Sequence, residues 1–175
     1  MSDEKFPILL VPDARLRQKS RPVSTSDDDA VRALVPRMLA TMYAAPGIGL
    51  AAPQIGSDLR LIVLDCGPKD APEPMVLVNP EIVAASKELA IREEGCLSLP
   101  GLYADVERPE RIKLRWRELD GTRREMEAEG LLGVCLQHEI DHLNGVLFVD
   151  HLSALKRNMM LRKLAKESKA KVRDE

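Results

Sequence analysis

Three residues able to bind a metal or move a proton, His138, Glu139 and His142, form an HExxH pattern. On a helix, the four-residue spacing of the histidines places both imidazoles on one face, one turn apart, so two ring nitrogens converge on one point. Glu139, beside the first histidine, can then take a proton from a metal-bound water. The alternative is a pair of core histidines that happen to flank a glutamate. It is disfavoured because a buried helix would then enclose three polar groups that need partners.

A catalytic metal usually has three protein ligands and one water, so a third ligand is needed. In metzincins it is a histidine six residues after the second one, and Phe148 occupies that position here, which excludes the class. A thermolysin-like site would need a downstream glutamate such as Glu167, which lies in the basic C-terminal stretch. Neither arrangement fits the sequence well.

Cys96 is the better candidate for the third ligand. It lies in the segment Glu94 to Ser98, after a predicted strand and next to Gly95, which allows close backbone approach. One thiolate and two neutral imidazoles give a divalent ion a tetrahedral site with one open position. Cys135 remains a fallback ligand, and an unmetalled Cys96 nucleophile would leave Glu139 and one histidine unexplained.

The segment from Gly47 to Gln54 contains no titratable group, so its contribution must come from its backbone and from the Gln54 amide. Glycine and alanine allow an extended substrate to lie against the main chain, and the amide can donate to a developing oxyanion. Taken alone, the segment is a glycine-rich loop after a helix, without the lysine of a phosphate-binding loop.

Three helices are predicted around these motifs. Residues 131–143 are apolar on nearly every side and end at Asn144-Gly145, which predicts a helix inside the protein. A first helix is predicted from Ser26 to the Pro46-Gly47 pair, with Pro36 either bending it or moving its start later. A last, lysine-rich and arginine-rich helix is predicted from about Ser153.

The remaining regular segments read as antiparallel strands. Residues 111–117 alternate strictly between apolar and basic side chains, and the Asp120-Gly121 pair predicts a hairpin back toward Met126. Short β-rich runs separated by turn residues predict a meander of four strands at 61–64, 75–78, 81–84 and 89–92. The fold class predicted is α+β, with short antiparallel β-sheets packed around a central buried helix that carries HExxH, and with a C-terminal helix.

Composition limits the classes of protein that the chain can represent. Its 175 residues are expected to form a single domain, residues 1–175, and 45% hydrophobic and 31% charged residues are typical of a globular protein. A formal net charge of -2 argues against a DNA-binding role, and no apolar run is long enough to cross a membrane. Three scattered cysteines suit a reducing compartment, and no secretory or transit peptide is evident at the N-terminus, so the cytoplasm is expected.

Taken together, three segments resemble the signature motifs of peptide deformylases: Gly47 to Gln54 matches GxGLAAPQ, Glu94 to Ser98 matches EGCLS, and Gln137 to Leu143 matches QHExDHL. The motifs are complete and in the same order, and weaker similarity covers most of the chain. The resemblance implies an enzyme that removes the formyl group from N-terminal formyl-methionine of nascent polypeptides. It also implies one divalent ion per chain, naturally Fe(II) and replaceable by Zn(II), Ni(II) or Co(II).

The same resemblance assigns roles to residues. Cys96, His138 and His142 bind the metal, Glu139 activates its water, and Gln54 with the backbone N–H of Leu97 stabilises the oxyanion. Substrate contacts are expected from glycines that admit the peptide backbone and from apolar residues around the methionine side chain: Gly47, Ile48, Gly49, Gly95, Leu131, Val134 and Cys135.

Less specific expectations concern the surroundings and the partners. Glu94 is expected to pair with an arginine such as Arg108, and Lys156 to Arg173 could contact the ribosome, although a solvated helix face explains the same charges. Gln137 and Asp141 could support the ligands or simply pack the helix. The rival functions are a zincin-type endopeptidase and a non-catalytic metal-binding relative.

Overall fold

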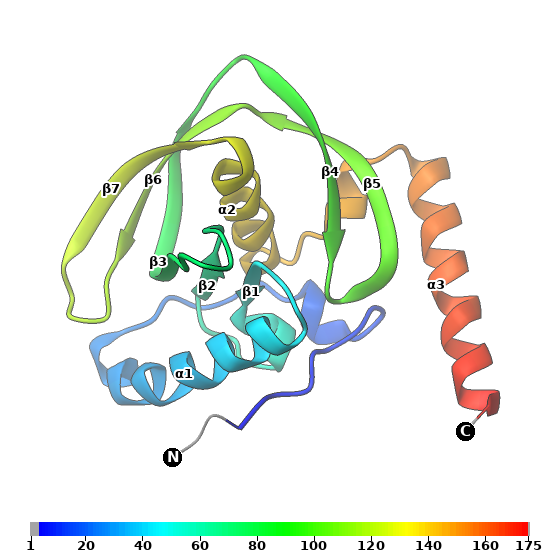
Figure 1. The fold of residues 1–175 in the computed structure, drawn as a ribbon, viewed down its shortest axis with the longest axis horizontal. Coiled ribbons are helices and arrows are strands. Elements are labelled where there is room, and N and C mark those ends of the chain that lie inside the picture. The colour runs from blue at the N-terminus through cyan, green and yellow to red at the C-terminus, as the bar shows by residue number, and fades with distance from the viewer. Residues whose placement is uncertain (1–3, 175) are drawn as a thin grey trace.

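The computed structural model describes residues 4–174 of the chain, so the first three residues of the N-terminal segment and Glu175 lie outside it. All strand pairs within its two sheets are antiparallel (Figure 1). The larger sheet has the order β1-β2-β3-β6-β7, made of β1 (Gly49–Ala51), β2 (Leu61–Asp65), β3 (Pro74–Ala85), β6 (Arg111–Arg117) and β7 (Arg123–Glu129). The smaller sheet pairs β4 (Leu89–Cys96) with β5 (Leu99–Pro109).

Helix α2 (Gly130–Leu143) lies at the centre, enclosed by strands of both sheets (Figure 1). Its buried apolar residues, including Leu136 and Ile140, pack against Ile62 and Leu64 of β2 and Trp116 of β6. This arrangement confirms the predicted α+β fold around a buried helix. The strand predicted at residues 111–117 and the hairpin that follows it are also confirmed as β6 and β7.

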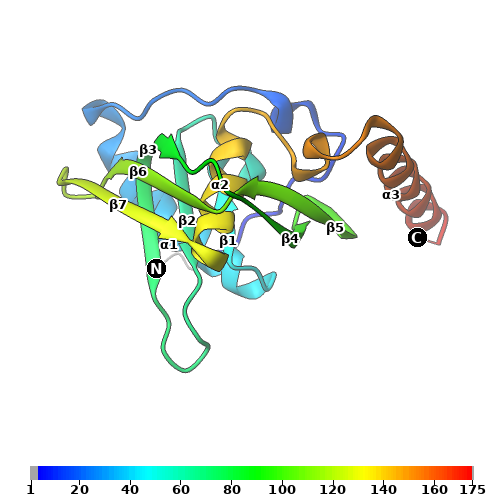
Figure 2. The same ribbon diagram turned by 90° about the horizontal axis from the view of Figure 1, so that it is seen from above.

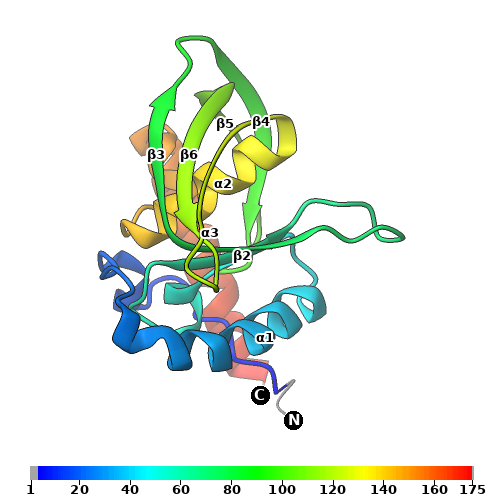
Figure 3. The same cartoon turned by 90° about the vertical axis from the view of Figure 1, so that its left-hand side faces the viewer.

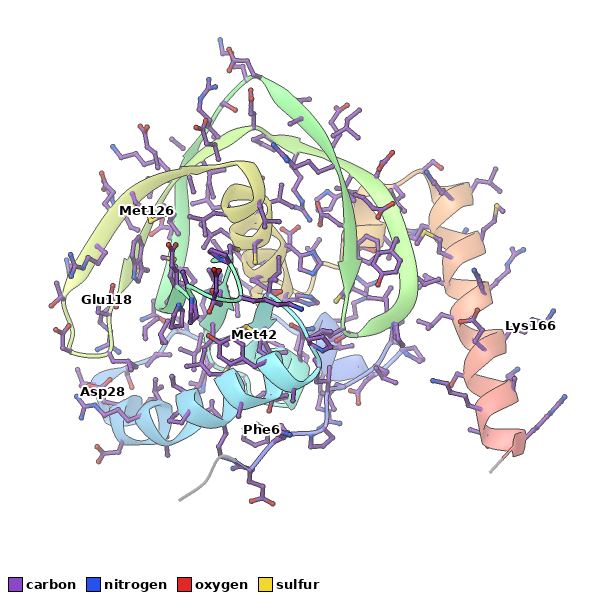
Figure 4. All side chains as sticks on the ribbon, viewed as in Figure 1. Phe6, Asp28, Met42, Glu118, Met126 and Lys166 are labelled. Atoms are coloured by element: carbon purple, nitrogen blue, oxygen red, sulfur yellow. The ribbon has the colours of Figure 1, made fainter. Side chains whose placement is uncertain are left out.

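Helix α1 (Asp28–Ala44) covers the opposite side of the β1–β2 region, so this part of the sheet lies between two helices (Figure 3). Every residue of β2 is buried, because Ile62 and Leu64 face α2 while Leu61 and Val63 face α1. Figure 4 labels Met42 where α1 meets the sheet, and this side chain has no exposed surface.

Helix α1 starts at Asp28, later than Ser26, as one of the two predicted alternatives had it. The backbone N–H of Ser24 donates to the Asp27 carboxylate at 2.9 Å, and this contact holds a 3₁₀ turn, Thr25–Asp27, ahead of the helix. The later start does not remove Pro36 from the helix, because Pro36 still lies inside α1. The helix continues through it because Val31, Val35 and Met38 stay anchored in the core.

The predicted four-strand meander is wrong in two respects. Residues 75–78 and 81–84 belong to one strand, β3, because Asn79 forms a bulge instead of a turn: it has φ 52°, and its side chain bonds both backbone groups of Val23. Strand β4 does not return along β3, which pairs with β6. It pairs with β5 in the second sheet, and this strand was not predicted.

Helix α3 (Ala154–Asp174) stands at one end of the molecule (Figure 2). Leu164, with Met160 and Leu161, packs against β5 and the 3₁₀ turn Phe148–His151. Lys166, labelled in Figure 4, lies on the exposed part of α3. Within residues 4–174, none of the helices has the length and apolar character needed to cross a membrane.

Gly145 offers a test of how tightly the chain must turn after α2. Its φ is +74°, and a Cβ there would collide with the carbonyl oxygen of Arg17. We expect Gly145→Ala to lower the free energy of unfolding by about 3 kcal/mol, because strain and collision add. In the control, Gly121→Ala, φ is +90° but nothing lies within 4 Å of the new Cβ. The control should lose only about 1 kcal/mol. Equal losses in urea unfolding would contradict the collision.

Candidate metal centre

Three potential ligands from two elements meet beside the central helix. Cys96 ends β4, while His138 and His142 lie one turn apart on α2. Their ligand atoms all lie within 4.8 Å of one another, and the Cys96 sulfur is 3.3 Å from His142 Nε2. The structure therefore brings together the three residues that sequence analysis selected. The alternative ligands Glu167, on α3, and Cys135 are not members of this group.

Glu139 lies next to the three ligands. Its Oε1 is 3.8 Å from His138 Nε2 and 4.0 Å from His142 Nε2, and only 2% of the residue is exposed. Within residues 4–174, its second oxygen has no hydrogen-bond partner although it is buried. Burial raises the pKa of Glu139 to about 7. A carboxyl group with such a pKa can both accept and donate a proton near neutral pH.

The electrostatics of the centre favour a positive charge. Burial alone would lower the pKa of His138, but hydrogen bonds with Cys96 and Glu94 outweigh it and raise this pKa to about 10. His142 has the opposite shift, because complete burial lowers its pKa. The one-sulfur, two-nitrogen donor set fits a divalent ion with an open position.

Glu94 connects the ligands to the rest of the protein. His138 Nδ1 donates to Glu94 at 2.9 Å, which leaves Nε2 to face Cys96 and His142. Arg108 donates two hydrogen bonds to the same carboxylate, at 2.6 and 2.9 Å, so the expected pairing of Glu94 with Arg108 is confirmed. Burial would raise the pKa of Glu94, but hydrogen bonds from His138 and Arg108 hold it at about 2. Glu94 is therefore a permanent buried anion.

The network extends to a residue that sequence analysis missed. Arg108 also donates to Asp141 at 2.9 Å, and His151 Nε2 lies 2.8 Å from the same carboxylate. No motif marks His151, because its partner lies ten residues away on the preceding helix. Gln137, by contrast, donates to the carbonyls of Pro109 and Gly133, a contact that fixes α2 against β5. Of the two flanking residues, Asp141 is thus in the network and Gln137 is not.

Gln54 reaches the ligands from the third sequence motif. Its side-chain oxygen accepts from the Ala51 N–H at 2.9 Å, while its amide nitrogen donates to Ser98 Oγ at 3.1 Å and lies 3.7 Å from the Cys96 sulfur. The side chain is 1% exposed. The segment predicted as a loop is ordered, with β1 followed by the 3₁₀ turn Ala52–Ile55. Leu97 and Ser98 form the turn between β4 and β5.

The glycines of the motifs lie where side chains would collide. A Cβ on Gly49 would be 2.9 Å from both the Cys135 sulfur and Glu139 Oε2. One on Gly47 would be 2.8 Å from Leu97, and one on Gly95 would be 2.5 Å from the Tyr103 ring. The backbone of Gly49 therefore lies close to Glu139, whereas Gly95 packs against Tyr103.

The apolar residues expected around a substrate side chain lie in the N-terminal half of α2 and directly before β1. The Cys135 thiol is buried and lies 3.8 Å from the Ile48 carbonyl oxygen, and Val134 precedes it on α2. Ile48 and Leu131 remain exposed, at 44% and 52%. Two large apolar side chains thus face solvent beside the centre.

Comparison with known proteins identifies a single family. The sequence pattern of the family described as polypeptide deformylase matches residues 5–158. The peptide deformylase of Mesorhizobium japonicum is 53% identical over 166 residues, covering 94% of each chain. That of Methylocella silvestris is 54% identical over 167 residues, covering 93% of this chain and 85% of its own.

Solved structures agree with the sequence comparison. The crystal structure of a peptide deformylase from Legionella pneumophila superposes with a TM-score of 0.88 at 49% identity, over 97% of this chain and 99% of that one. A peptide deformylase from Synechococcus elongatus, solved in complex with actinonin, has a TM-score of 0.83 at 45% identity. It covers 90% of this chain, and the match spans 86% of its own.

The buried pairing of Glu94 can be tested through metal affinity. Glu94→Gln keeps the shape of the side chain but removes the anion that His138 and Arg108 share, and its NH₂ group would face one of these donors. We expect the affinity for Zn(II) to fall roughly 10- to 100-fold in a competition titration with a chelator. Glu93→Gln is the control, because Glu93 is the exposed neighbour on the same strand. Similar affinities for the two variants would contradict the role of Glu94.

Proposed function

The chain belongs to the peptide deformylase family, enzymes that act on N-formyl-methionyl peptides, and we propose that it is a metal-dependent hydrolase that removes the formyl group from nascent polypeptides and releases formate. One observation carries this proposal: Glu139, buried and with one oxygen unpartnered within residues 4–174, lies beside the converging atoms of Cys96, His138 and His142. A group that can transfer a proton, Glu139, therefore lies beside a set of potential metal ligands.

We infer that Cys96, His138 and His142 hold one divalent ion. Such an ion would polarise the formyl carbonyl and make a water molecule more acidic. Fe(II) is our proposal for the native metal, with Zn(II), Ni(II) or Co(II) as substitutes, because a mixed sulfur and nitrogen site accepts several of these ions.

Glu139 would carry the proton through the reaction. It takes a proton from the attacking water, whose oxygen bonds to the formyl carbon, and later gives a proton to the leaving amine nitrogen as the C–N bond breaks. Its pKa near 7 suits both transfers. The products are formate and a free amino terminus on methionine.

Gln54 and Leu97 would stabilise the negative oxygen of the tetrahedral intermediate. The Gln54 amide is held toward Cys96 by Ser98 and by the Ala51 N–H, so little reorganisation is needed when charge develops. The Leu97 N–H comes from the turn directly after Cys96. Donors from two separate segments would then meet at the same oxygen.

The substrate would lie between β1 and β4. The backbone of Gly47 and Gly49 would flank the substrate on the β1 side, and that of Gly95 on the β4 side, where each glycine packs closely against its neighbours. The methionine side chain would contact the apolar group formed by Ile48, Leu131, Val134 and Cys135.

Glu139→Gln separates this function from simple metal binding. We expect the variant, loaded with metal, to release formate from formyl-Met-Ala-Ser about 10²- to 10⁴-fold more slowly than wild type, because proton transfer is lost while the ligands remain. Glu167→Gln, in the exposed part of α3, is the control and should match wild type.

Two other outcomes would each reject part of the proposal. Metal binding without formate release by the wild type would mean a non-catalytic relative. Cleavage of the unformylated peptide as well would mean an endopeptidase.

We also infer a contact with the ribosome, in the cytoplasm, through the exposed lysines of α3. Charge reversal of Lys163, Lys166 and Lys169 to Glu should abolish co-sedimentation with ribosomes, while formate release from a short peptide stays unchanged, because these residues lie away from the ligands. Reversal of Lys69, Lys87 and Arg123, which are exposed elsewhere, is the control for net charge. Unchanged co-sedimentation of the α3 variant would reject the contact.

A further inference from the structure

Two of the three free cysteines, Cys66 and Cys135, lie outside the ligand set and beside each other. Cys66 directly follows β2, where Ile62 and Leu64 face α2, and the alternation of a strand directs Cys66 to the same side. Cys135 lies on α2 within the apolar cluster that Cys66 also contacts. The two sulfurs therefore approach each other from a strand and from a helix.

The two thiols lie close enough for each to shift the pKa of the other. The Ile48 carbonyl oxygen links the two segments. It accepts from the N–H of Asp65, the residue before Cys66, at 2.8 Å, and it lies 3.8 Å from the Cys135 sulfur. Two thiols that approach each other from facing elements are candidates for a disulfide.

The two cysteines differ in access and in acidity. Cys66 is partly exposed at the end of its strand, whereas Cys135 is 6% exposed. The hydrogen bond with Cys135 lowers the pKa of Cys66, and the pKa of Cys135 is raised by the same bond and by burial. Oxidants react with an accessible thiolate, so Cys66 is the thiol that meets them first.

We propose that Cys66 and Cys135 form an oxidation site that closes to a disulfide under peroxide. The Cys66 sulfur attacks one oxygen of hydrogen peroxide, the O–O bond breaks, and Cys66 becomes a sulfenic acid while the released hydroxide takes a proton and leaves as water. The Cys135 thiol then loses its proton and attacks the Cys66 sulfur. The S–O bond breaks, a second water leaves, and the S–S bond forms.

The disulfide would reach the catalytic region through Cys135. A Cβ built on Gly49 would lie 2.9 Å from the Cys135 sulfur and 2.9 Å from Glu139 Oε2, so both side chains lie against the Gly49 backbone. Formation of the disulfide would move the Cys135 sulfur toward Cys66 and change the packing between β1 and Glu139. We expect formate release to fall at least about tenfold, because small displacements of catalytic groups have large effects on rate. This effect rests on the proposed function, whereas the disulfide itself does not.

The test uses the zinc-loaded holoenzyme, since Zn(II) does not change oxidation state and protects Cys96 as a ligand. After treatment with hydrogen peroxide, free thiols are blocked with iodoacetamide and the digested protein is analysed by non-reducing mass spectrometry. We expect one cross-linked peptide pair containing Cys66 and Cys135, cleaved by dithiothreitol. Recovery of alkylated Cys135 together with overoxidised Cys66, or oxidation confined to Cys96, would overturn the proposal.

Cys66→Val provides the matched variant, because it removes the attacking thiol at a partly exposed position and keeps an apolar side chain. We expect it to form no cross-link and to keep its formate release under peroxide, while wild type loses activity and regains it with dithiothreitol. Equal loss in both proteins would overturn the effect on catalysis. If the untreated enzyme released no formate, the proposed function would fail, and the cross-link would still be measured on its own.

Discussion

The structure depends on the need to give partners to polar groups that α2 carries into the interior. Two imidazoles and a carboxylate on a buried helix cost several kcal/mol each if they are left unpaired. Glu94 meets part of this demand, since its carboxylate accepts from His138 and from Arg108 while 5% of the residue is exposed. Removing Glu94 would take this buried partner away from both His138 and Arg108. The position of β4 against α2 is therefore fixed as much by polar contacts as by apolar packing.

Strand geometry explains how one short motif supplies both a potential metal ligand, Cys96, and the Glu94 carboxylate that bonds His138. Glu94 and Cys96 are two residues apart on β4, so their side chains leave the same face of the strand, toward α2. Arg108 reaches Glu94 from the neighbouring strand β5, and continues to Asp141 on the helix. Gly95, between the two, carries no side chain and lies against the Tyr103 ring. Because side chains alternate along a strand, Glu94 and Cys96 face α2, whereas Gly95 between them packs against Tyr103.

Features encoded within one segment of the sequence could be predicted, whereas features that depend on residues far apart in the sequence could not. Helix α2 and strand β6 were predicted nearly to the residue, because their apolar periodicity lies within one segment. The HExxH spacing and the Cys96 motif likewise pointed to one centre, which the structure brings together. The continuity of β3 through Asn79 could not be predicted, because it depends on Asn79 bonding to Val23, 56 residues away. His151 was missed for the same reason: its role exists only through Asp141.

The three cysteines show why residue type alone cannot assign chemistry. Cys96 faces two imidazoles, the Gln54 amide and the Ser98 N–H, so donors and ligands surround its sulfur. Cys135 lies in the apolar cluster, as expected for a small buried residue, yet its thiol contacts Gly49 and Cys66. Cys66 has the same side chain at the edge of that cluster, where solvent reaches it. One residue type thus becomes a potential metal ligand, a core residue or an accessible thiol, according to which neighbours the two sheets place around it.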